Sequence, residues 1–231
     1  MSRTTTTGLV LAAAIGCYQI TMLANGGAVG GGSSSSSSTS MAERTPEEMA
    51  RDSYNSGIGH RDKGDKLEAQ TAKDDKEKVK NLEKAKDEYT KAMKDFEKAS
   101  TLLPTMYQAY NGLGYTSRKT GDYAKALQMY DKALALAPGF PDAIEYRGVA
   151  YLKLNRIEDA KKAYLDLFAR DRKQADQLMQ AMTQWVNEHQ KDAAGVDAST
   201  VTGLSTWIQE RAKIATTTAA MALTGHRSIW N

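Results

Sequence analysis

Apolar positions in the central part of the chain repeat with a period of 34 residues. Small residues keep this spacing at Ala92, Ala126 and Ala160. Aromatic residues keep the same spacing at Phe96, Tyr130 and Tyr164. A fixed period of this length, with small and aromatic residues in phase, is typical of stacked pairs of helices. One pair cannot bury its apolar face alone, so neighbouring pairs must stack, and the pattern predicts an all-α solenoid with a concave binding surface.

The second period, residues 107–138, has the most specific pattern. Its members are Tyr110, Leu113-Gly114, Gly121-Asp122-Tyr123, Ala126, Tyr130 and Pro138. This segment resembles a tetratricopeptide repeat (TPR), in which two helices are joined by a short turn and a proline follows the second. The resemblance implies a TPR-type helical-hairpin solenoid of about three repeats, closed by C-terminal capping helices.

The third period, residues 141–172, fits the same family. The matching residues are Gly148, Tyr151, Ala160 and Tyr164. Asn155 stands where glycine usually turns the chain in this family. Because asparagine adopts positive φ more readily than most residues, we expect the turn to be kept.

The first period, residues 50–104, is interrupted by a charged insertion over about residues 69–88. A first helix and its turn are indicated by Gly57, His60 and Gly64-Asp65. The second helix comes too late in the chain, at Ala92, Phe96, Ala99 and Pro104. Apolar residues between Leu82 and Leu103 alternate in steps of three and four, which predicts one helix face. Two alternatives remain: a single helix from about Lys66 to Leu103, or two helices with a break near residues 73–75. Both predict a charged helical projection.

Helical patterning continues beyond residue 172, where the period ends. Residues 173–215 are expected to form capping helices that cover the apolar face of the last repeat, with Trp185 and Trp207 in the contact. The remaining residues, 216–231, are expected to be a disordered tail.

The N-terminal part has a different composition. Residues 1–16 combine a basic end with a short apolar core, the pattern of a secretory signal. The run Ala14-Ile15-Gly16-Cys17 resembles the bacterial lipoprotein signal, which makes Cys17 a candidate lipidation site. Residues 17–44 are rich in glycine and serine, so we expect a flexible tether. A signal cleaved without lipidation, an uncleaved span over residues 8–24 and an apolar start with no targeting role are the alternatives.

The folded part is expected to start at Thr45. Thr45-Pro46-Glu47-Glu48 has the sequence of a capping box with proline at the first helical position. Tyr18, directly after the cysteine, is not the acidic residue that retains such lipoproteins in the inner membrane. The resemblance therefore favours an outer-membrane lipoprotein that faces the periplasm, with a secreted or periplasmic protein as the alternative.

Composition and charge argue against several classes of function. The chain has 31 basic and 28 acidic residues, and the two signs are interleaved along the sequence. The sequence therefore shows no basic face of the kind that indicates nucleic-acid binding. One cysteine and three scattered histidines give no metal-ligand spacing and no catalytic constellation. We therefore expect no cofactor, no metal, no small-molecule substrate and no enzyme activity.

In TPR proteins, the first helix of each pair lines the groove that holds a peptide or a helix of the partner. The resemblance places these residues in the groove: Tyr54, Asn55, Arg61, Asn111, Tyr115, Arg118, Glu145, Tyr146, Val149 and Lys153. The Lys, Arg and Asn clamp of TPR co-chaperones for a terminal dicarboxylate is missing, because its places hold Tyr54, Ile58, Gly112, Asp142 and Tyr146.

Repeats of this kind predict a binding protein. The leading hypothesis is a non-catalytic adaptor or scaffold, exported and lipid-anchored, that binds a peptide or helix of an envelope protein in its groove. The alternative is a soluble secreted or periplasmic TPR protein that holds a partner segment as a chaperone does.

Overall fold

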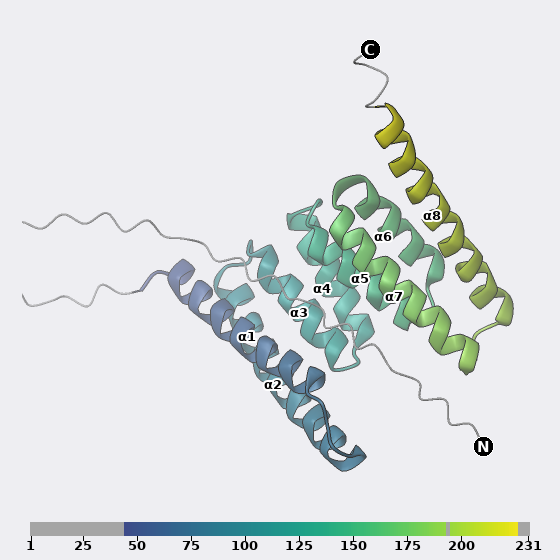
Figure 1. The fold of residues 1–231 in the computed structure, drawn as a ribbon. Helices are drawn as coiled ribbons and strands as arrows, with labels where there is room; N and C mark the ends of the chain where they lie inside the picture. Colours follow the sequence, from purple (N-terminus) through teal and green to yellow (C-terminus); the bar gives the residue numbers. More distant parts are fainter. Residues whose placement is uncertain (1–43, 193–194, 226–231) are drawn as a thin grey trace, which may run out of the picture. The chain divides into compact units, whose positions relative to one another are not determined.

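The computed structural model describes residues 44–192 and 195–225, with side chains as far as residue 214. This part of the chain forms eight helices and no strand (Figure 1). The helices are α1 (Pro46–Ala69), α2 (Asp75–Leu102), α3 (Tyr107–Lys119), α4 (Tyr123–Leu136), α5 (Pro141–Lys153), α6 (Ile157–Arg170), α7 (Arg172–Lys191) and α8 (Ala198–Gly225). The all-α prediction is confirmed.

Successive helices form hairpins that stack on one another. The pairs α1/α2, α3/α4 and α5/α6 each pack together, and α2, α4 and α6 also contact the first helix of the next pair. The first helices contact one another as well, α1 with α3, α3 with α5 and α5 with α7. This nearest-neighbour packing is that of a TPR-type helical-hairpin solenoid.

Close packing of glycine on an aromatic ring fixes the register of the first two hairpins. A Cβ added to Gly114 would lie 2.5 Å from the ring of Tyr130, and one added to Gly57 would lie 2.7 Å from the ring of Phe96. Gly112 of α3 meets the same Phe96 ring from the other side, at 2.8 Å. The phenylalanine therefore lies between two successive repeats. This packing explains why glycine and an aromatic residue occur together in the first two hairpins; in the third, Gly148 packs on Leu178 of α7 instead.

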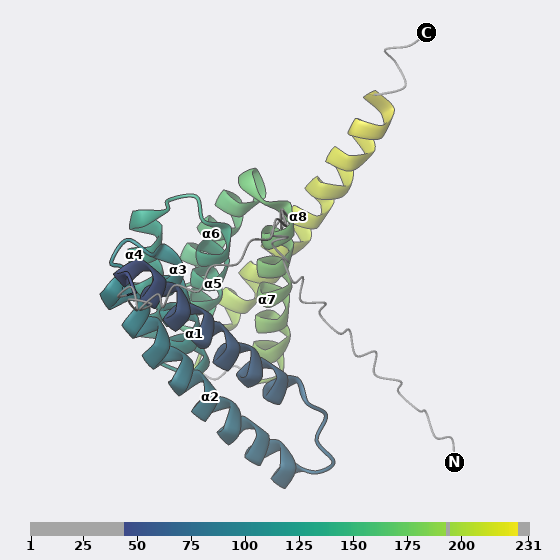
Figure 2. The same cartoon turned by 90° about the vertical axis from the view of Figure 1, so that its left-hand side faces the viewer.

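The insertion in the first repeat lengthens both of its helices. α1 has 24 residues and α2 has 28, against 13 in α3 and 14 in α4. The chain leaves the helix after Ala69 and enters the next one at Asp75, where the Asp74 side chain accepts the cap hydrogen bond from the Glu77 amide. Of the two alternatives, the single helix from Lys66 to Leu103 is wrong. The tip of the hairpin extends past the ends of α3 and α4 (Figures 1 and 2).

Predicted capping and turn chemistry is found at three places. Thr45 and Glu48 form both hydrogen bonds of a capping box at the start of α1. Gly121, between α3 and α4, has a φ of 91°. Asn155, at the equivalent place between α5 and α6, has a φ of 56°. The expectation that asparagine replaces glycine in this turn is confirmed.

The last two helices pack against the third repeat. α7 buries Ala175, Leu178, Met182 and Trp185, while the ring of Trp207 in α8 lies 5.3 Å from that of Tyr164 in α6. α8 continues to Gly225 and extends beyond α7 (Figure 2). The expectation that the capping helix ends before residue 216 and gives way to a disordered tail is therefore wrong, because α8 continues to Gly225. Residues 212–224 carry many alanines and no proline or glycine, and such a sequence prolongs a helix.

The N-terminal predictions lie outside the described residues. They concern the signal over residues 1–16, lipidation of Cys17 and the tether over residues 17–44, of which the structure describes only the last residue. The last residues of the expected tail, 226–231, lie outside as well. Among the helices that the structure does describe, none has the length and apolar composition needed to span a membrane.

Candidate functional site

The ten residues predicted to bind a partner lie on three helices that contact one another in sequence. α1 carries Tyr54, Asn55 and Arg61, α3 carries Asn111, Tyr115 and Arg118, and α5 carries Glu145, Tyr146, Val149 and Lys153. We call the surface formed by these residues on α1, α3 and α5, together with the adjoining part of α7, the first-helix face. The stacking of the hairpins brings residues from distant parts of the chain onto this one face.

The middle of this face is more tightly packed than the sequence indicates. The exposed fractions of Asn111, Tyr115 and Glu145 are 9%, 9% and 7%. The ring of Tyr115 lies 5.1 Å from that of Tyr146 and 6.4 Å from that of Tyr89, both edge-on. A partner can therefore reach these three residues only at their edges, whereas Asn55 and Lys153 are exposed.

Asp65, in the extended part of α1, holds Tyr115 of this face and Tyr89 of α2. The hydroxyl groups of Tyr89 and Tyr115 both donate to its Oδ1 atom, at 2.7 and 2.6 Å. Burial, together with this carboxylate, raises the pKa of both phenols above the usual value. Asp65 thus connects α1 with α2 and α3. It can accept both hydrogen bonds because α1 continues past this residue instead of ending in a turn.

Lys119, the last residue of α3, pairs with the same end of α1. Its Nζ atom lies 3.4 Å from Oδ1 of Asp65 and forms an ion pair with Glu68. The ammonium group also lies 5.3 Å from the ring centre of Tyr89. The C-terminal end of α1 therefore brings two carboxylates onto a cation of the first-helix face.

Arginine and tyrosine side chains alternate across the face. The Arg118 guanidinium lies 5.0 Å from the ring centre of Tyr115 and 5.5 Å from that of Tyr146, and Arg61 approaches Tyr115 at 5.7 Å. These distances permit cation–π attraction. Burial raises the pKa of Tyr146 to about 12, so its hydroxyl remains protonated at neutral pH. The Nε atom of Arg118 is buried and has no hydrogen-bond partner among the described residues.

Glu145 is the buried acid of this face. Burial raises the pKa of its carboxyl group to about 7, with Arg118 acting in the opposite direction and Asp142 in the same one. Neutral pH therefore falls within its titration range. The neighbouring Asp142 is held by Gln174 of α7, whose amide donates to Oδ1 at 2.5 Å.

A pocket of about 580 Å³ opens beside this cluster, between the ends of α1, α3 and α5, the start of α4 and the middle of α7. The lining residues that matter here are Glu68, Arg118, Lys119, Val149, Lys153 and Trp185. Trp185 is 3% exposed, and its indole Nε1 has no hydrogen-bond partner in the described part of the chain. Lys153 lies 3.7 Å from Glu188 of α7. We call this space the α3–α7 pocket.

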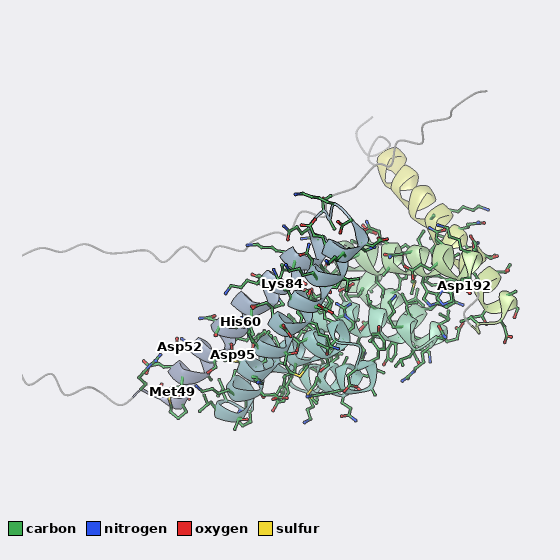
Figure 3. All side chains as sticks on the ribbon, turned by 90° about the horizontal axis from the view of Figure 1, so that it is seen from below. Met49, Asp52, His60, Lys84, Asp95 and Asp192 are labelled. Carbon is green, nitrogen blue, oxygen red and sulfur yellow. The ribbon has the colours of Figure 1, made fainter. Side chains whose placement is uncertain are left out.

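This arrangement is suited to binding. Lysine ammonium groups and partly exposed tyrosine rings can hold a carbonyl or a carboxylate of a chain segment. Within the described residues, no group of three His, Cys, Asp or Glu side chains could hold a metal ion. His60, labelled in Figure 3, lies on the α1–α2 hairpin. Its Nδ1 is 2.6 Å from Oε2 of Glu88.

Three important residues of this face were not predicted: Asp65, Glu68 and Trp185. The repeat pattern indicates a turn at Asp65 and a capping contact at Trp185, and it indicates no role for Glu68. A continued run of helix-forming residues, Lys66-Leu67-Glu68-Ala69, is the signal that could have extended α1. Nothing comparable indicates Trp185 as part of a pocket.

Comparisons with known proteins support the repeat assignment. Residues 117–184 match the family described as tetratricopeptide repeat. Over 77 residues, the chain is 38% identical to a UDP-N-acetylglucosamine–peptide N-acetylglucosaminyltransferase of Giardia intestinalis. That match covers 33% of this chain and 5% of the relative. A crystal structure of MamA protein shares 19% identity, covering 65% of this chain and 97% of that one at a TM-score of 0.35. The last likeness is too weak to carry an argument.

The family match and the stacked hairpins define the class as a TPR-type helical solenoid. Proteins with this fold typically serve as scaffolds for other proteins.

Proposed function

We propose that this protein is a non-catalytic adaptor that binds a peptide or a helix of another protein on its first-helix face. The observation that carries the proposal is the α3–α7 pocket of about 580 Å³, which opens beside the ordered pair Tyr115 and Tyr146 and is lined by Val149 and the exposed Lys153. A chain segment in the pocket would contact Val149 and Lys153.

The binding mechanism is preorganised docking. Tyr115 and Tyr146 are held in place by ring contacts, and the hydroxyl of Tyr115 is fixed by Asp65. Side chains that are already ordered lose little conformational freedom when a partner arrives. Val149 and Lys153 then provide apolar and charged contact beside this rigid cluster.

Site-specific photocrosslinking tests the interaction. A benzophenone amino acid at position 149 or 153, in the full chain expressed in its own cells, should give a defined crosslinked product. The same group at position 165 of α6, where the natural Leu165 is 45% exposed, is the matched control and should not give that product. Equal crosslinking at positions 149 and 165, or none at 149 and 153, would overturn the proposal.

The proposal also includes export and lipid anchoring through Cys17. Its support is the sequence of residues 1–17, followed by a Gly/Ser-rich segment long enough to hold the folded part away from a surface. Two or more acyl chains anchor a protein stably, whereas one gives marginal binding. We place the protein at the outer membrane, facing the periplasm, with an envelope protein as the partner.

Cys17→Ser tests this part. It should abolish labelling by a fatty-acid analogue and move the protein from the membrane fraction to the soluble one. Mass spectrometry of the native N-terminus separates the anchored form from the alternative, a soluble secreted or periplasmic chaperone-like protein. Unchanged membrane association of Cys17→Ser would contradict lipid anchoring and leave the adaptor proposal to its own test.

A further inference from the structure

Glu145 of α5 is buried where this helix packs against α3, and only 7% of the residue is exposed. We call the contact between the two helices around Glu145 the α3–α5 joint. Glutamates are seldom buried to this degree unless a cation pairs with them. In the described part of the chain, the Glu145 carboxyl group forms no ion pair and no hydrogen bond. Its charged form is therefore poorly compensated at this place.

The surroundings of this carboxyl group come from every helix packed against α5. Arg118 of α3 and Asp142, one turn earlier on α5, are the charged groups that act on it, and their effects oppose each other. Tyr130 of α4 and Tyr146 of α5 are close enough for Glu145 to raise their pKa values, so both phenols stay neutral. Among the described residues of α6 and α7, no charged group acts on Glu145.

Arg118 is held in a position that keeps it from pairing fully with Glu145. Its guanidinium lies 5.0 Å from the ring centre of Tyr115 and 5.5 Å from that of Tyr146. The hydroxyl of Tyr115 is in turn fixed by Asp65. A turn of the guanidinium toward Glu145 would weaken the contacts with both rings. The attraction of Arg118 therefore offsets only part of the cost of burying a carboxylate, and the neutral carboxyl group fits the joint better.

We propose that Glu145 makes the α3–α5 joint sensitive to protons: the joint is closed while the carboxyl group is neutral and loosens when the group ionises. This inference goes beyond the proposed function and holds whether or not the face binds a chain segment. Tyr146, Val149 and Lys153 follow on the same helix, so loosening of the joint would also change the candidate binding surface.

Ionisation of Glu145 opposes folding. Burial raises the pKa of its carboxyl group from 4.5 to about 7. Between these two values the folded chain binds more protons than the unfolded chain, so the free energy of unfolding falls as pH rises through this range. Through Glu145 alone, the folding equilibrium constant should decrease about 20-fold between about pH 5.5 and about pH 8.5.

Urea unfolding of the full chain at these two pH values tests the inference. Glu145→Gln keeps the shape of the side chain and cannot ionise, so it should lose about 20-fold less of its folding equilibrium constant over this range than the natural protein. Glu158→Gln removes a carboxylate from a position of α6 where the side chain is 76% exposed, and it should keep the natural loss. An equal loss in all three proteins would overturn the proposal.

Hydrogen exchange separates a loosened joint from a general loss of stability. At about pH 8.5, amides of α3 and α5 should exchange about fivefold faster in the natural protein than in Glu145→Gln, and amides of α1 should differ less. At about pH 5.5 the two proteins should exchange alike. A difference of the same size in all these helices would overturn the local opening.

Carbon-detected NMR of the natural protein tests the inference even where Glu145→Gln does not fold. The side-chain carboxyl carbon of Glu145, assigned through its bonded nuclei, should titrate with a midpoint of about 7. A midpoint at the ordinary value of a glutamate would overturn the proposal. None of these results bears on crosslinking at positions 149 and 153, so failure of this inference can be told apart from failure of the adaptor proposal.

Discussion

The first and second hairpins use the same dipeptide in opposite ways. Gly121-Asp122 ends α3: Gly121 has a φ of 91°, and the Asp122 side chain accepts the cap hydrogen bond from the Lys125 amide. Gly64-Asp65 stands at the equivalent place of the first repeat but lies inside α1. There Gly64 packs on the ring of Tyr89, and Asp65 binds two tyrosine hydroxyls. A turn signal is thus overridden when a matching helix lies opposite and the following residues favour a helix.

The extension of the first hairpin repeats the packing that holds the regular part. Gly57 meets Phe96, and one heptad later Gly64 meets Tyr89, at the same antiparallel register. The extended part of the hairpin is therefore held by a second contact of the same kind. A TPR hairpin can thus be lengthened without loss of register when a second such pair lies between the regular part and the inserted residues.

The largest expected effect is at Tyr89. Tyr89→Ala should destabilise the first hairpin by about 3–5 kcal/mol, because it leaves a large cavity in the core. Urea unfolding followed by circular dichroism measures the change. Tyr89→Phe is the control; it keeps the ring and loses one hydrogen bond, so it should cost only about 1 kcal/mol. An equal loss in both variants would contradict the importance of ring packing.

The next effect concerns Gly64. A Cβ here would lie 2.5 Å from the Tyr89 ring, so Gly64→Ala should destabilise by about 1–3 kcal/mol despite the better helix propensity of alanine. Gly59, on the same helix, has no atom within 4 Å of its added Cβ. Gly59→Ala should therefore stabilise, by up to about 1 kcal/mol. Thermal melting should show a lower melting temperature for Gly64→Ala and a higher one for Gly59→Ala. A change in the same direction for both variants would refute this account of Gly64.

A smaller effect is expected in the turn of the second hairpin. Gly121→Ala should cost about 1–2 kcal/mol, because a side chain at positive φ is strained even where there is space. Gly121→Asn should cost less, since Asn155 occupies the equivalent place of the third hairpin at a φ of 56°. The urea midpoints of the two variants measure the difference in stability. If the space at this position, and not its backbone conformation, set the cost, Gly121→Asn would be the less stable variant.

The smallest expected effect is a pH dependence of the first hairpin. Hydrogen bonds from Lys91 and His60 lower the pKa of Glu88 to about 2. A carboxyl group whose pKa is lowered on folding contributes stability above the pKa of the unfolded chain and loses it as pH falls through the folded pKa. The contribution should therefore disappear between about pH 4.5 and pH 2. Because the group is near the surface, it should amount to less than about 1 kcal/mol.

Glu88→Gln provides the measurement for this pair. The acid-induced loss of unfolding free energy should be shallower in Glu88→Gln than in the natural protein. Glu83→Gln, which removes another carboxylate from α2, should keep the natural slope. Identical slopes for all three proteins would show that the His60–Glu88–Lys91 cluster contributes nothing to stability.

The sequence predicted the regular part of the fold well. The start at Thr45, the turn conformation of Asn155 and the stacking of helix pairs follow from local chemistry and from a period that can be read directly. It predicted the candidate site only in part. Family resemblance selects the residues that line the groove in an ordinary repeat. It cannot show that Tyr115 is buried against the lengthened helix α1, whose Asp65 accepts its hydrogen bond.

The sequence by itself determined that helix pairs form, in which register they pack and where the short turns fall, because these depend on neighbouring residues and on periodicity. Tertiary structure alone decided where α1 ends, what Asp65 binds and which groups surround the α3–α7 pocket. Those outcomes depend on side chains far apart in the chain meeting across packed helices. Gly64 illustrates the difference. Its neighbours in the chain indicate a turn, but in the structure it lies inside α1 and packs directly against the Tyr89 ring of α2.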